Sequence, residues 1–537
     1  MEVVLFMWIV AAFAILCCGV LDLAKMVTSI RWLKREERFP ALCDEDQPFI
    51  ITLLPVLREQ RLITDTLHAF ARLKYPQQRH HIFVITAEKE LAQREEAKVR
   101  LVSLAKDIAS KQFSTSFLVE KYLGVFSEDV LKKVLATARH KESDGEIHAF
   151  LREVFDAYPT TIDLVKEDIA FLNKQAGMPL FTHLHCPCVD GNMGQQLQYA
   201  VEQLPLHLPN QDMPKSHAYL AIYNADSRPH PDTFEYMAKT CGNYRLQYHS
   251  LPPIIQQSAI FLENWSNLGS SLKGLLLQSA AILQTRWVMS HEIPRLRRQS
   301  RSALLFNSGK LKLLQRLTGV EFALCVGHGS FLRYDLAEEL NLFSMSDISD
   351  DLLWSFRLCI EHVPMLPLPL LESAESPTTV NSLIIQKRSW FLGYTEYFRC
   401  RSLALQTKKF KRSSVEFVTW HGLIRAVKWL FLSPILFLVF VLPVLLHSWQ
   451  LLLISLAVFA LYGFSTYAVI LMELEMLRKK SGGVWSPGSF SNTHKICLVA
   501  FSLPAFLLES LGPWWCLFQC FYWTMTRTPA HKQKTER

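Results

Sequence analysis

The chain has 537 residues, of which 50% are hydrophobic, and a formal net charge of +8. This length can hold two or three domains, while the hydrophobic content is high for a soluble protein and points to membrane segments. The 12 cysteines show no spacing typical of a disulfide framework, so we expect reduced thiols.

The first predicted element is an uncharged run from Val3 to Leu21, just long enough to cross a hydrocarbon core of about 30 Å. It lacks the basic start and the cleavage site of a signal peptide, so residues 1–23 are expected to form a membrane anchor. Cations follow this run and also precede the next long apolar run. Because Lys and Arg near membrane spans stay cytoplasmic, we expect residues 24–428 on that side.

The central region alternates short apolar runs with amphipathic stretches, which is typical of an α/β domain. Near-continuous apolar runs at 49–54, 81–86 and 218–223 predict strands that are buried on both faces of a sheet. Residues 89–177 have the pattern of charged helices, and we interpret them as a helical insertion. Two interpretations of this insertion stay open. It is either a solvated lid or packing element without chemistry, or an element that binds a partner or gates the substrate.

The C-terminal part contains two more uncharged runs, from Trp429 to Leu446 and from Leu451 to Met472, which predict two membrane helices within 429–475. A basic segment, 401–428, precedes them and is expected at the membrane interface. Residues 495–525 are largely apolar, but Leu511-Gly512-Pro513 should break them into a hairpin or re-entrant segment. A basic tail, 526–537, follows.

Polar loops follow the predicted strands, where ligands of open α/β sheets bind. Pro55 and Glu59 follow the first strand, and Glu88 follows the second. Asn224 and Asp226 follow the 218–223 strand. A carboxylate there can bind Mg²⁺ or Mn²⁺, which takes one or two protein carboxylates and fills its other positions with phosphate oxygens and water. An exposed acid in a turn is the alternative interpretation of Asp226.

Two further segments lie between the second and third strands. The cluster His183, His185, Cys186 and Cys188 has the residue types of metal ligands but no second half at zinc-site spacing, so packing is expected there. The stretch 191–200 places glycines before a helix, whose N-terminus offers N–H groups to an anion.

Two motifs follow towards the membrane. Gly327-His328-Gly329 precedes the paired acids Asp350 and Asp351. One interpretation of these acids is structural, because carboxylates at the start of a helix interact favourably with the helix dipole. The stretch 386–390 (QKRSW) could likewise be an interfacial tryptophan anchor.

These segments resemble, in order and over roughly residues 48–392, the motifs of family-two inverting glycosyltransferases, in particular membrane-bound bacterial polysaccharide synthases. The resemblance implies a GT-A fold, that is, a Rossmann-like nucleotide-binding α/β domain, over residues 24–400. Three positions depart from the family pattern: Asn224 replaces the first Asp of D-x-D, Asn192 a lysine, and Ser389 the arginine of Q-x-x-R-W.

The resemblance also implies roles for single residues. Asp351 is the base that deprotonates the acceptor hydroxyl, and Asp226 is the ligand of Mg²⁺ or Mn²⁺. The donor-binding residues are Pro55, Glu59, Glu88, Asn224, Asp226, Gln386, Arg388 and Trp390. The acceptor loop comprises Gly327, His328, Gly329 and Asp350.

The expected function is metal-dependent transfer of a sugar, with inversion, from a nucleotide-sugar donor to a lipid or glycan acceptor. We expect an inner-membrane enzyme of cell-envelope polysaccharide biosynthesis, with export or assembly partners as further candidates and no nucleic-acid partner. The three departures leave open an inactive relative that acts as a membrane scaffold. A transporter is disfavoured by the few spans and the single intramembrane charge.

Overall fold

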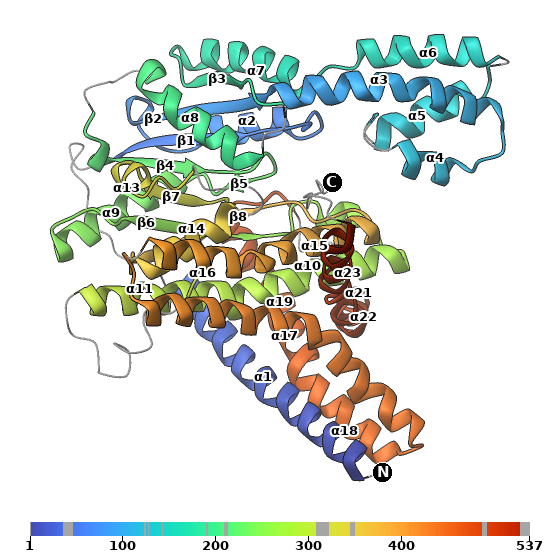
Figure 1. Cartoon of the computed structure of the whole chain (residues 1–537), viewed down its shortest axis with the longest axis vertical. Helices are drawn as coiled ribbons and strands as arrows, with labels where there is room; N and C mark the ends of the chain where they lie inside the picture. The colour runs from blue at the N-terminus through green and yellow to red at the C-terminus, as the bar shows by residue number, and fades with distance from the viewer. Residues whose placement is uncertain are drawn as a thin grey trace.

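The computed structural model describes residues 2–35, 47–122, 125–126, 128–141, 143–189, 192–208, 213–307, 322–343, 350–407, 409–485 and 491–526. A mixed sheet covered by helices forms one end of the molecule, and a bundle of apolar helices extends from the other end (Figure 1). This arrangement agrees with the predicted α/β class, which is confirmed.

The sheet has eight strands in the order β3-β2-β1-β4-β7-β6-β8-β5. Strands β1 to β4 are parallel, β7 runs antiparallel between β4 and β6, and β6 is parallel to β8. The bounds are β1 (Phe49–Pro55), β2 (His80–Ala87), β3 (Phe181–Cys186), β4 (Ala218–Ile222), β5 (Arg228–Pro229), β6 (Ile254–Ile260), β7 (Ser330–Arg333) and β8 (Met365–Ser373). The three strands predicted from the sequence are therefore β1, β2 and β4.

Helices cover both faces of the sheet, which explains the continuous apolar runs of its strands. Because successive side chains of a strand point to opposite faces, Ile51 and Leu53 of β1 join one core and Ile50 and Leu54 the other. The first core includes α8 (Met193–His207), α13 (Tyr334–Glu339), α14 (Asp350–Ile360) and α16 (Tyr397–Gln406), and the second includes α2 (Ile63–Ala71), α7 (Thr161–Ala176) and α9 (Thr233–Tyr248). Short 3₁₀ turns are η2 (Gln77–Arg79), η3 (Lys215–His217) and η4 (Trp265–Leu268).

The insertion expected at 89–177 divides into two parts. Helices α3 (Glu88–Ala109), α4 (Thr115–Tyr122), α5 (Glu128–Ala138) and α6 (Asp144–Ala157) project from the sheet (Figure 1) and share a core of their own. The last helix, α7, instead packs Val165, Ile169 and Leu172 into the core of the sheet. Only α3 to α6 therefore form the projecting insertion.

A layer of helices lies between the sheet and the apolar bundle (Figure 1). It contains α10 (Leu272–Trp287), the π-helical turn η5 (Val288–Glu292), α11 (Ile293–Asn307) and α15 (Val380–Thr395). The bundle contains α1 (Glu2–Lys34), α17 (Arg412–Leu445), α18 (Trp449–Phe459), the π-helical turn η6 (Ala460–Phe464) and α19 (Ser465–Met472), followed by α20 (Leu474–Ser481). The interfacial segment expected at 401–428 is thus divided between α16 and the first half of α17.

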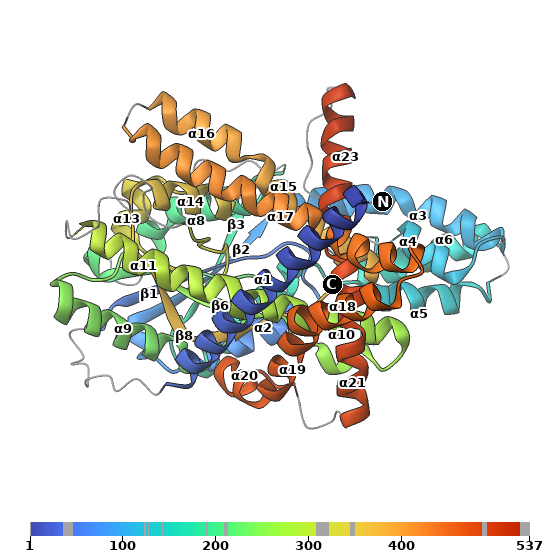
Figure 2. The same cartoon turned by 90° about the horizontal axis from the view of Figure 1, so that it is seen from below.

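Within the described ranges, four helical stretches are long and apolar enough to cross a membrane: Glu2–Lys34, Arg412–Leu445, Trp449–Met472 and Asn492–Trp523. The fourth is not one straight helix. It consists of α21 (Asn492–Ala500), α22 (Ser502–Leu508) and α23 (Leu511–Thr526), and Figure 2 shows α21 and α23 extending to opposite sides of the bundle. The fourth stretch is therefore broken at two points, and the hairpin or re-entrant segment expected at 495–525 stays a prediction.

The breaks differ from the expected position at 511–513. They lie at Phe501 and at Glu509–Ser510, whereas Pro513 lies in the first turn of α23, where a missing N–H costs nothing. Gly512 fits against α15, because a Cβ there would come within 2.6 Å of the backbone nitrogen of Arg388. The glycine thus permits α23 to pack closely on α15.

Candidate functional site

The carboxyl ends of β1 and β2 are tied together by α8. Val56 N donates to Ile85 O at 2.9 Å. The side-chain amide of Gln196 in α8 donates to the carbonyl oxygens of Val56 and Ile85, each at 3.2 Å. Asn192 is the N-cap of α8 and forms a capping box with Gln195. Asn192 therefore orients the start of this helix, and Gly191 lies outside the described residues.

The loop that contains Pro55 and Glu59 is held by a buried carboxylate, Glu90, whose residue is 3% exposed. Glu90 accepts hydrogen bonds from Arg58 N at 3.0 Å and from Thr161 N at 2.7 Å. Glu59 N in turn donates to the hydroxyl of Thr161 at 2.8 Å. Glu90 thereby joins the predicted donor loop to α3 and α7. This role could not be predicted from the sequence, since acids in the first turn of a helix are common.

Glu88 lies at the end of a hydrogen-bonded chain across β2 and β3. Its carboxylate contacts His185 Nε2 at 2.8 Å, and the hydroxyl of Thr86 contacts His185 Nδ1 at 2.9 Å and His183 Nε2 at 2.8 Å. Burial, with a smaller contribution from Lys166, lowers the pKa of His183 to about 4, so this imidazole is neutral. The two histidines serve strand packing and the orientation of Glu88.

Asp226 lies in the turn after β4 and is almost buried, with 6% of the residue exposed. The turn is closed by Ser227, whose hydroxyl accepts from Asn224 N at 3.2 Å. The same hydroxyl donates to Glu372 of β8 at 3.3 Å. The Asn224–Asp226 motif is thus fixed to the opposite half of the sheet.

The Gly327–Gly329 loop, which is predicted to bind the acceptor and is called the acceptor loop for that reason, is anchored on the same carboxylate. His328 Nδ1 forms an ion pair with Glu372, which is fully buried. Gly329 has φ +66°, and a Cβ there would lie 2.5 Å from the carbonyl oxygen of Gln257. Only glycine fits this approach. Glu372, which was not predicted as a site residue, therefore links Ser227, next to Asp226, to His328 of the predicted acceptor loop.

Two neighbouring groups titrate away from their ordinary values. Desolvation lowers the pKa of His328, but the carboxylates of Glu372, Glu292 and Asp351 outweigh it and raise this pKa. Burial raises the pKa of Glu292 to about 7, although the hydroxyl of Ser258 and the charge of His328 act against the shift. The acceptor loop is thus surrounded by carboxylates that favour a charged His328.

This shift predicts a pH dependence of stability. Glu292 loses its proton near 4.5 in the unfolded chain but near 7 in the folded one, so its contribution is present at low pH and is lost as the pH rises through 7. The raised pKa of His328 acts in the same direction. Glu292→Gln should abolish about 3 kcal/mol of the loss between pH 5 and pH 8. Apparent Tm values at a fixed scan rate check this, and an unchanged pH slope in the variant would contradict it.

Asp351, at the start of α14, lies beside the acceptor loop. A Cβ on Gly327 would lie 3.5 Å from the Cβ of Asp351 and 3.6 Å from the terminal methyl of Met193, the first residue of α8. The helix start is fixed by Ser355, whose hydroxyl donates to Asp351 O at 2.6 Å and accepts from Cys325 N at 2.7 Å. The side chain of Asp350 lies outside the described residues.

The last motif lies on α15 and is divided between two faces of the helix. Gln386 is buried, and the ring of Trp390 lies 5.9 Å from that of Phe261, which follows β6. The guanidinium of Arg388 instead lies 4.9 Å above Trp515 of α23. The structure therefore brings Gln386 and Trp390 to the face towards the sheet but places Arg388 towards α23, and we leave Arg388 out of the donor site.

Comparison with known proteins bears on this site. Residues 275–467 match the family model of glycosyl transferase family group 2. The chain carries a family-two glycosyltransferase region. This match confirms the predicted family and enzyme class, and it contains Asp351, Gln386 and Trp390 but not Asp226. No curated protein matches the sequence.

Among solved structures, the chain is similar to mannosyltransferase PcManGT from Pyrobaculum calidifontis in complex with GDP-Man and Mn²⁺, at 10% identity and a TM-score of 0.38, covering 94% of this chain and 98% of that one. It is also similar to S. aureus TarS 1–349, at 8% identity and a TM-score of 0.32, covering 85% and 90%. A third structure holds the same TarS segment with UDP-GlcNAc, at 9% identity and a TM-score of 0.32. TM-scores below 0.5 do not establish a shared fold.

The residues present fit a divalent cation whose coordination is completed by phosphate oxygens. Among the described residues, no group of three or more His, Cys, Asp and Glu side chains could hold a metal by itself. Mg²⁺ and Mn²⁺ need fewer protein ligands when phosphate oxygens complete the coordination. Asp226, as a single carboxylate after β4, suits a cation that arrives with a diphosphate.

Proposed function

We propose that this chain transfers a sugar from a nucleoside diphosphate to an acceptor hydroxyl at a membrane, with inversion at the anomeric carbon. The observation that carries the proposal is the convergence of three motifs. Asp351 lies against Gly327 of the acceptor loop, and Glu372 bonds both His328 of that loop and Ser227 beside Asp226. Acceptor-side and donor-side groups are therefore held together by one buried carboxylate.

In the proposed reaction, the acceptor oxygen attacks the anomeric carbon while the bond from this carbon to the diphosphate oxygen breaks. Asp351 accepts the proton of the acceptor hydroxyl. Glu372 and His328 are positioning residues that keep the acceptor loop in place. Asp226 would hold Mg²⁺ or Mn²⁺, which offsets the charge of the leaving diphosphate when it is bound.

The donor subsite is proposed at the carboxyl edge of β1, β2 and β4. It comprises Pro55, Glu59, Glu88, Asn224 and Asp226, with Gln386 and Trp390 closing it from α15. The hydrogen bonds of Glu90 and His185 support this assignment, because they fix the loop and the carboxylate that would face the nucleotide.

The acceptor is proposed to be a lipid or a membrane-associated glycan. Four apolar stretches support a membrane location, and the cations of residues 24–38 and 408–428 support a cytoplasmic catalytic domain in the inner membrane. Because α21 to α23 follow a broken path, three long apolar helical stretches remain in the described part of the bundle. Such a small bundle favours an acceptor that enters from the membrane surface.

The configuration of the product tests the proposal. The purified chain in lipid nanodiscs, supplied with a panel of nucleotide sugars, Mn²⁺ and a membrane lipid extract, should form a glycoside of inverted configuration, as measured by NMR coupling constants. A retained configuration would contradict the single displacement. Donor binding without transfer to any lipid or to water would favour the alternative, an inactive membrane scaffold.

A further inference from the structure

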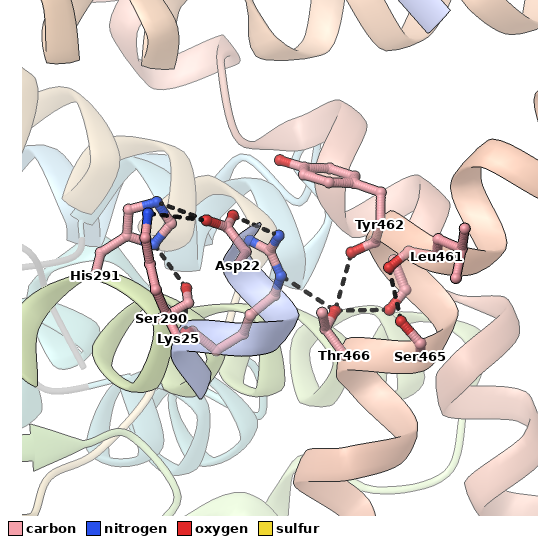
Figure 3. Close-up of polar contacts among 10 residues, drawn as sticks. Asp22, Lys25, Ser290, His291, Leu461, Tyr462, Ser465 and Thr466 are labelled. Carbon is pink, nitrogen blue, oxygen red and sulfur yellow. Dashed lines mark hydrogen bonds and ion pairs between the residues drawn. The ribbon is translucent and has the colours of Figure 1, made fainter. Parts of the chain in front are cut away.

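Buried ion pairs connect the C-terminal and N-terminal apolar helices to the helix layer under the sheet. One pair is centred on Asp22 of α1 (Figure 3), whose carboxylate contacts the guanidinium of Arg286 in α10 at 3.0 Å. Another joins Glu509, which lies between α22 and α23, to Lys387 Nζ of α15 at 2.9 Å, with the two side chains 16% and 4% exposed. A charge within a long apolar stretch is costly, so the partner of Glu509 is informative.

The pair of Asp22 and Arg286 has its further contacts among the membrane helices. Arg286 Nε donates to the hydroxyl of Thr466 in α19 at 3.1 Å, and the guanidinium lies 4.7 Å above the ring of Tyr462 in η6. This pair therefore ties α1, η6 and α19 to α10. Its contacts hold the bundle together.

The pair of Glu509 and Lys387 has different surroundings. Lys387 Nζ donates to the side-chain oxygen of Gln284 in α10 at 2.8 Å and to Glu509 at 2.9 Å. The same ammonium lies 5.0 Å from the centre of the ring of Trp390, which is three residues further along α15 and thus on a neighbouring part of the helix surface. Glu509 therefore fixes the charged group beside which Trp390 packs.

Trp390 in turn borders the strand end that carries the buried carboxylate of the site. Its ring packs with Phe261 and Ala374, which follow β6 and β8. Ala374 N donates to the last carbonyl of β6 at 2.9 Å, so the pairing of the two strands continues to this point. Glu372, which holds the acceptor loop, lies two residues before Ala374. The packing of Trp390 thus reaches the proposed active site.

A cavity between α10 and α15 borders the same ion pair. Gln284, Gln386 and Lys387 line it together with Phe261 and Ser376. Gln386 is 4% exposed, and among the described residues its side-chain nitrogen has no hydrogen-bond partner. A buried donor without a partner is costly and calls for a ligand or a water. The amide of Gln386 is therefore available to an oxygen atom of a bound molecule.

We propose that Glu509 is a positioning residue for donor binding, which acts through Lys387 on the face of α15 that carries Gln386 and Trp390. The inference rests on the proposed function, because Gln386 and Trp390 belong to the proposed donor subsite. When Glu509 is neutralised, the ammonium of Lys387 stays buried without its counter-charge. We then expect Lys387 to turn away, so that Trp390 and the amide of Gln386 lose their fixed positions.

Donor titration of the full chain in lipid nanodiscs tests this inference. The probe is the nucleotide sugar that gives the unmutated chain its largest thermal shift in Mn²⁺. Glu509→Gln should raise the Kd of this probe roughly 5- to 10-fold, the loss expected when about one hydrogen bond of the donor site is weakened. The kcat at saturating donor should stay near normal, because the variant leaves Asp351 and the acceptor loop in place.

Asp22→Asn is the matched control, because it breaks a buried ion pair of the same bundle whose contacts do not include α15. It should lower the apparent Tm and leave the donor Kd unchanged. A double variant with Glu509→Gln and Lys387→Met separates positioning from stability. Removing both charges should restore the apparent Tm, whereas the donor Kd should stay raised because the ammonium beside Trp390 is absent.

Three results would overturn the inference while leaving the proposed function intact. These are an unchanged donor Kd in Glu509→Gln, an equal loss of affinity in Asp22→Asn, and a double variant in which donor affinity returns together with the apparent Tm. If Glu509→Gln does not fold, the double variant alone decides, since a normal donor Kd in it would contradict the role of the pair. A folded unmutated chain that binds no nucleotide sugar in Mn²⁺ would overturn the donor subsite and this inference together.

Discussion

Asp351→Asn is expected to lower the rate of sugar transfer by roughly 10² to 10⁴, the usual contribution of a general base, while donor affinity stays near normal. Asparagine keeps the shape of the side chain and can still accept the hydrogen bond from Leu352 N that Asp351 accepts at 2.9 Å. It cannot take the proton of the acceptor. Initial rates at saturating donor, together with donor Kd values, separate the two effects.

The matched control for this variant is Glu339→Gln, which neutralises an exposed acid on α13. It should leave the transfer rate unchanged. Full activity of Asp351→Asn, in a preparation whose unmutated protein is active, would move the role of the base to another group, with Asp350 as the next candidate.

Asp226→Ala is expected to abolish metal-dependent donor binding and sugar transfer together. The variant removes the carboxylate of the Asn224–Asp226 motif, so the charge of the diphosphate is left without a protein-bound cation. Isothermal titration of a nucleoside diphosphate in Mn²⁺ measures the loss. Asp232→Ala, which removes a nearby carboxylate paired with Lys74 at 2.9 Å, is the control and should retain donor binding.

A donor affinity that Asp226→Ala leaves unchanged would remove this residue from the metal site. The two variants should differ from each other. Asp226→Ala should lose donor binding and transfer, whereas Asp351→Asn should lose only the transfer rate. Equal losses of binding in both variants would indicate a general collapse of the edge of the sheet.

The strands and the order of the motifs could be predicted from the sequence because they depend on local signals. Runs such as Phe49–Pro55 are apolar except for Thr52, since both faces of the strand are covered, and polar loops follow them. The helical periodicity of residues 89–177 also predicted the insertion, but it could not separate α7 from α3 to α6. That division depends on which core Val165 and Ile169 join, which is a tertiary property.

The links between the motifs could not be predicted in this way. Glu372 and Glu90 lie far along the chain from the loops that they hold, and nothing in their neighbouring sequence indicates a buried carboxylate. Arg388 was expected to reach the donor because it is next to a motif position, yet adjacent residues of a helix point in different directions. The helix places Arg388 against Trp515.

The position of a helix break was also mispredicted for a physical reason. Pro513 suggested a break, but a proline in the first turn of a helix starts it as readily as it ends another. The break itself falls at Glu509–Ser510. There the hydroxyl of Ser510 donates to Trp429 O at 2.6 Å, so α17 stabilises the turn through a contact that is distant in sequence.

The measurement that tests the central claim most directly is the affinity of the unmutated chain for nucleotide sugars in Mn²⁺ and in EDTA. A thermal-shift screen of a nucleotide-sugar panel, followed by titration of the best compound, provides it. A glycosyltransferase site that contains Asp226 predicts that at least one nucleotide sugar raises the apparent Tm in Mn²⁺ and that EDTA removes the shift. Equal affinity in EDTA would contradict the role of the metal, and a folded protein that binds no nucleotide sugar in Mn²⁺ would contradict the donor site itself.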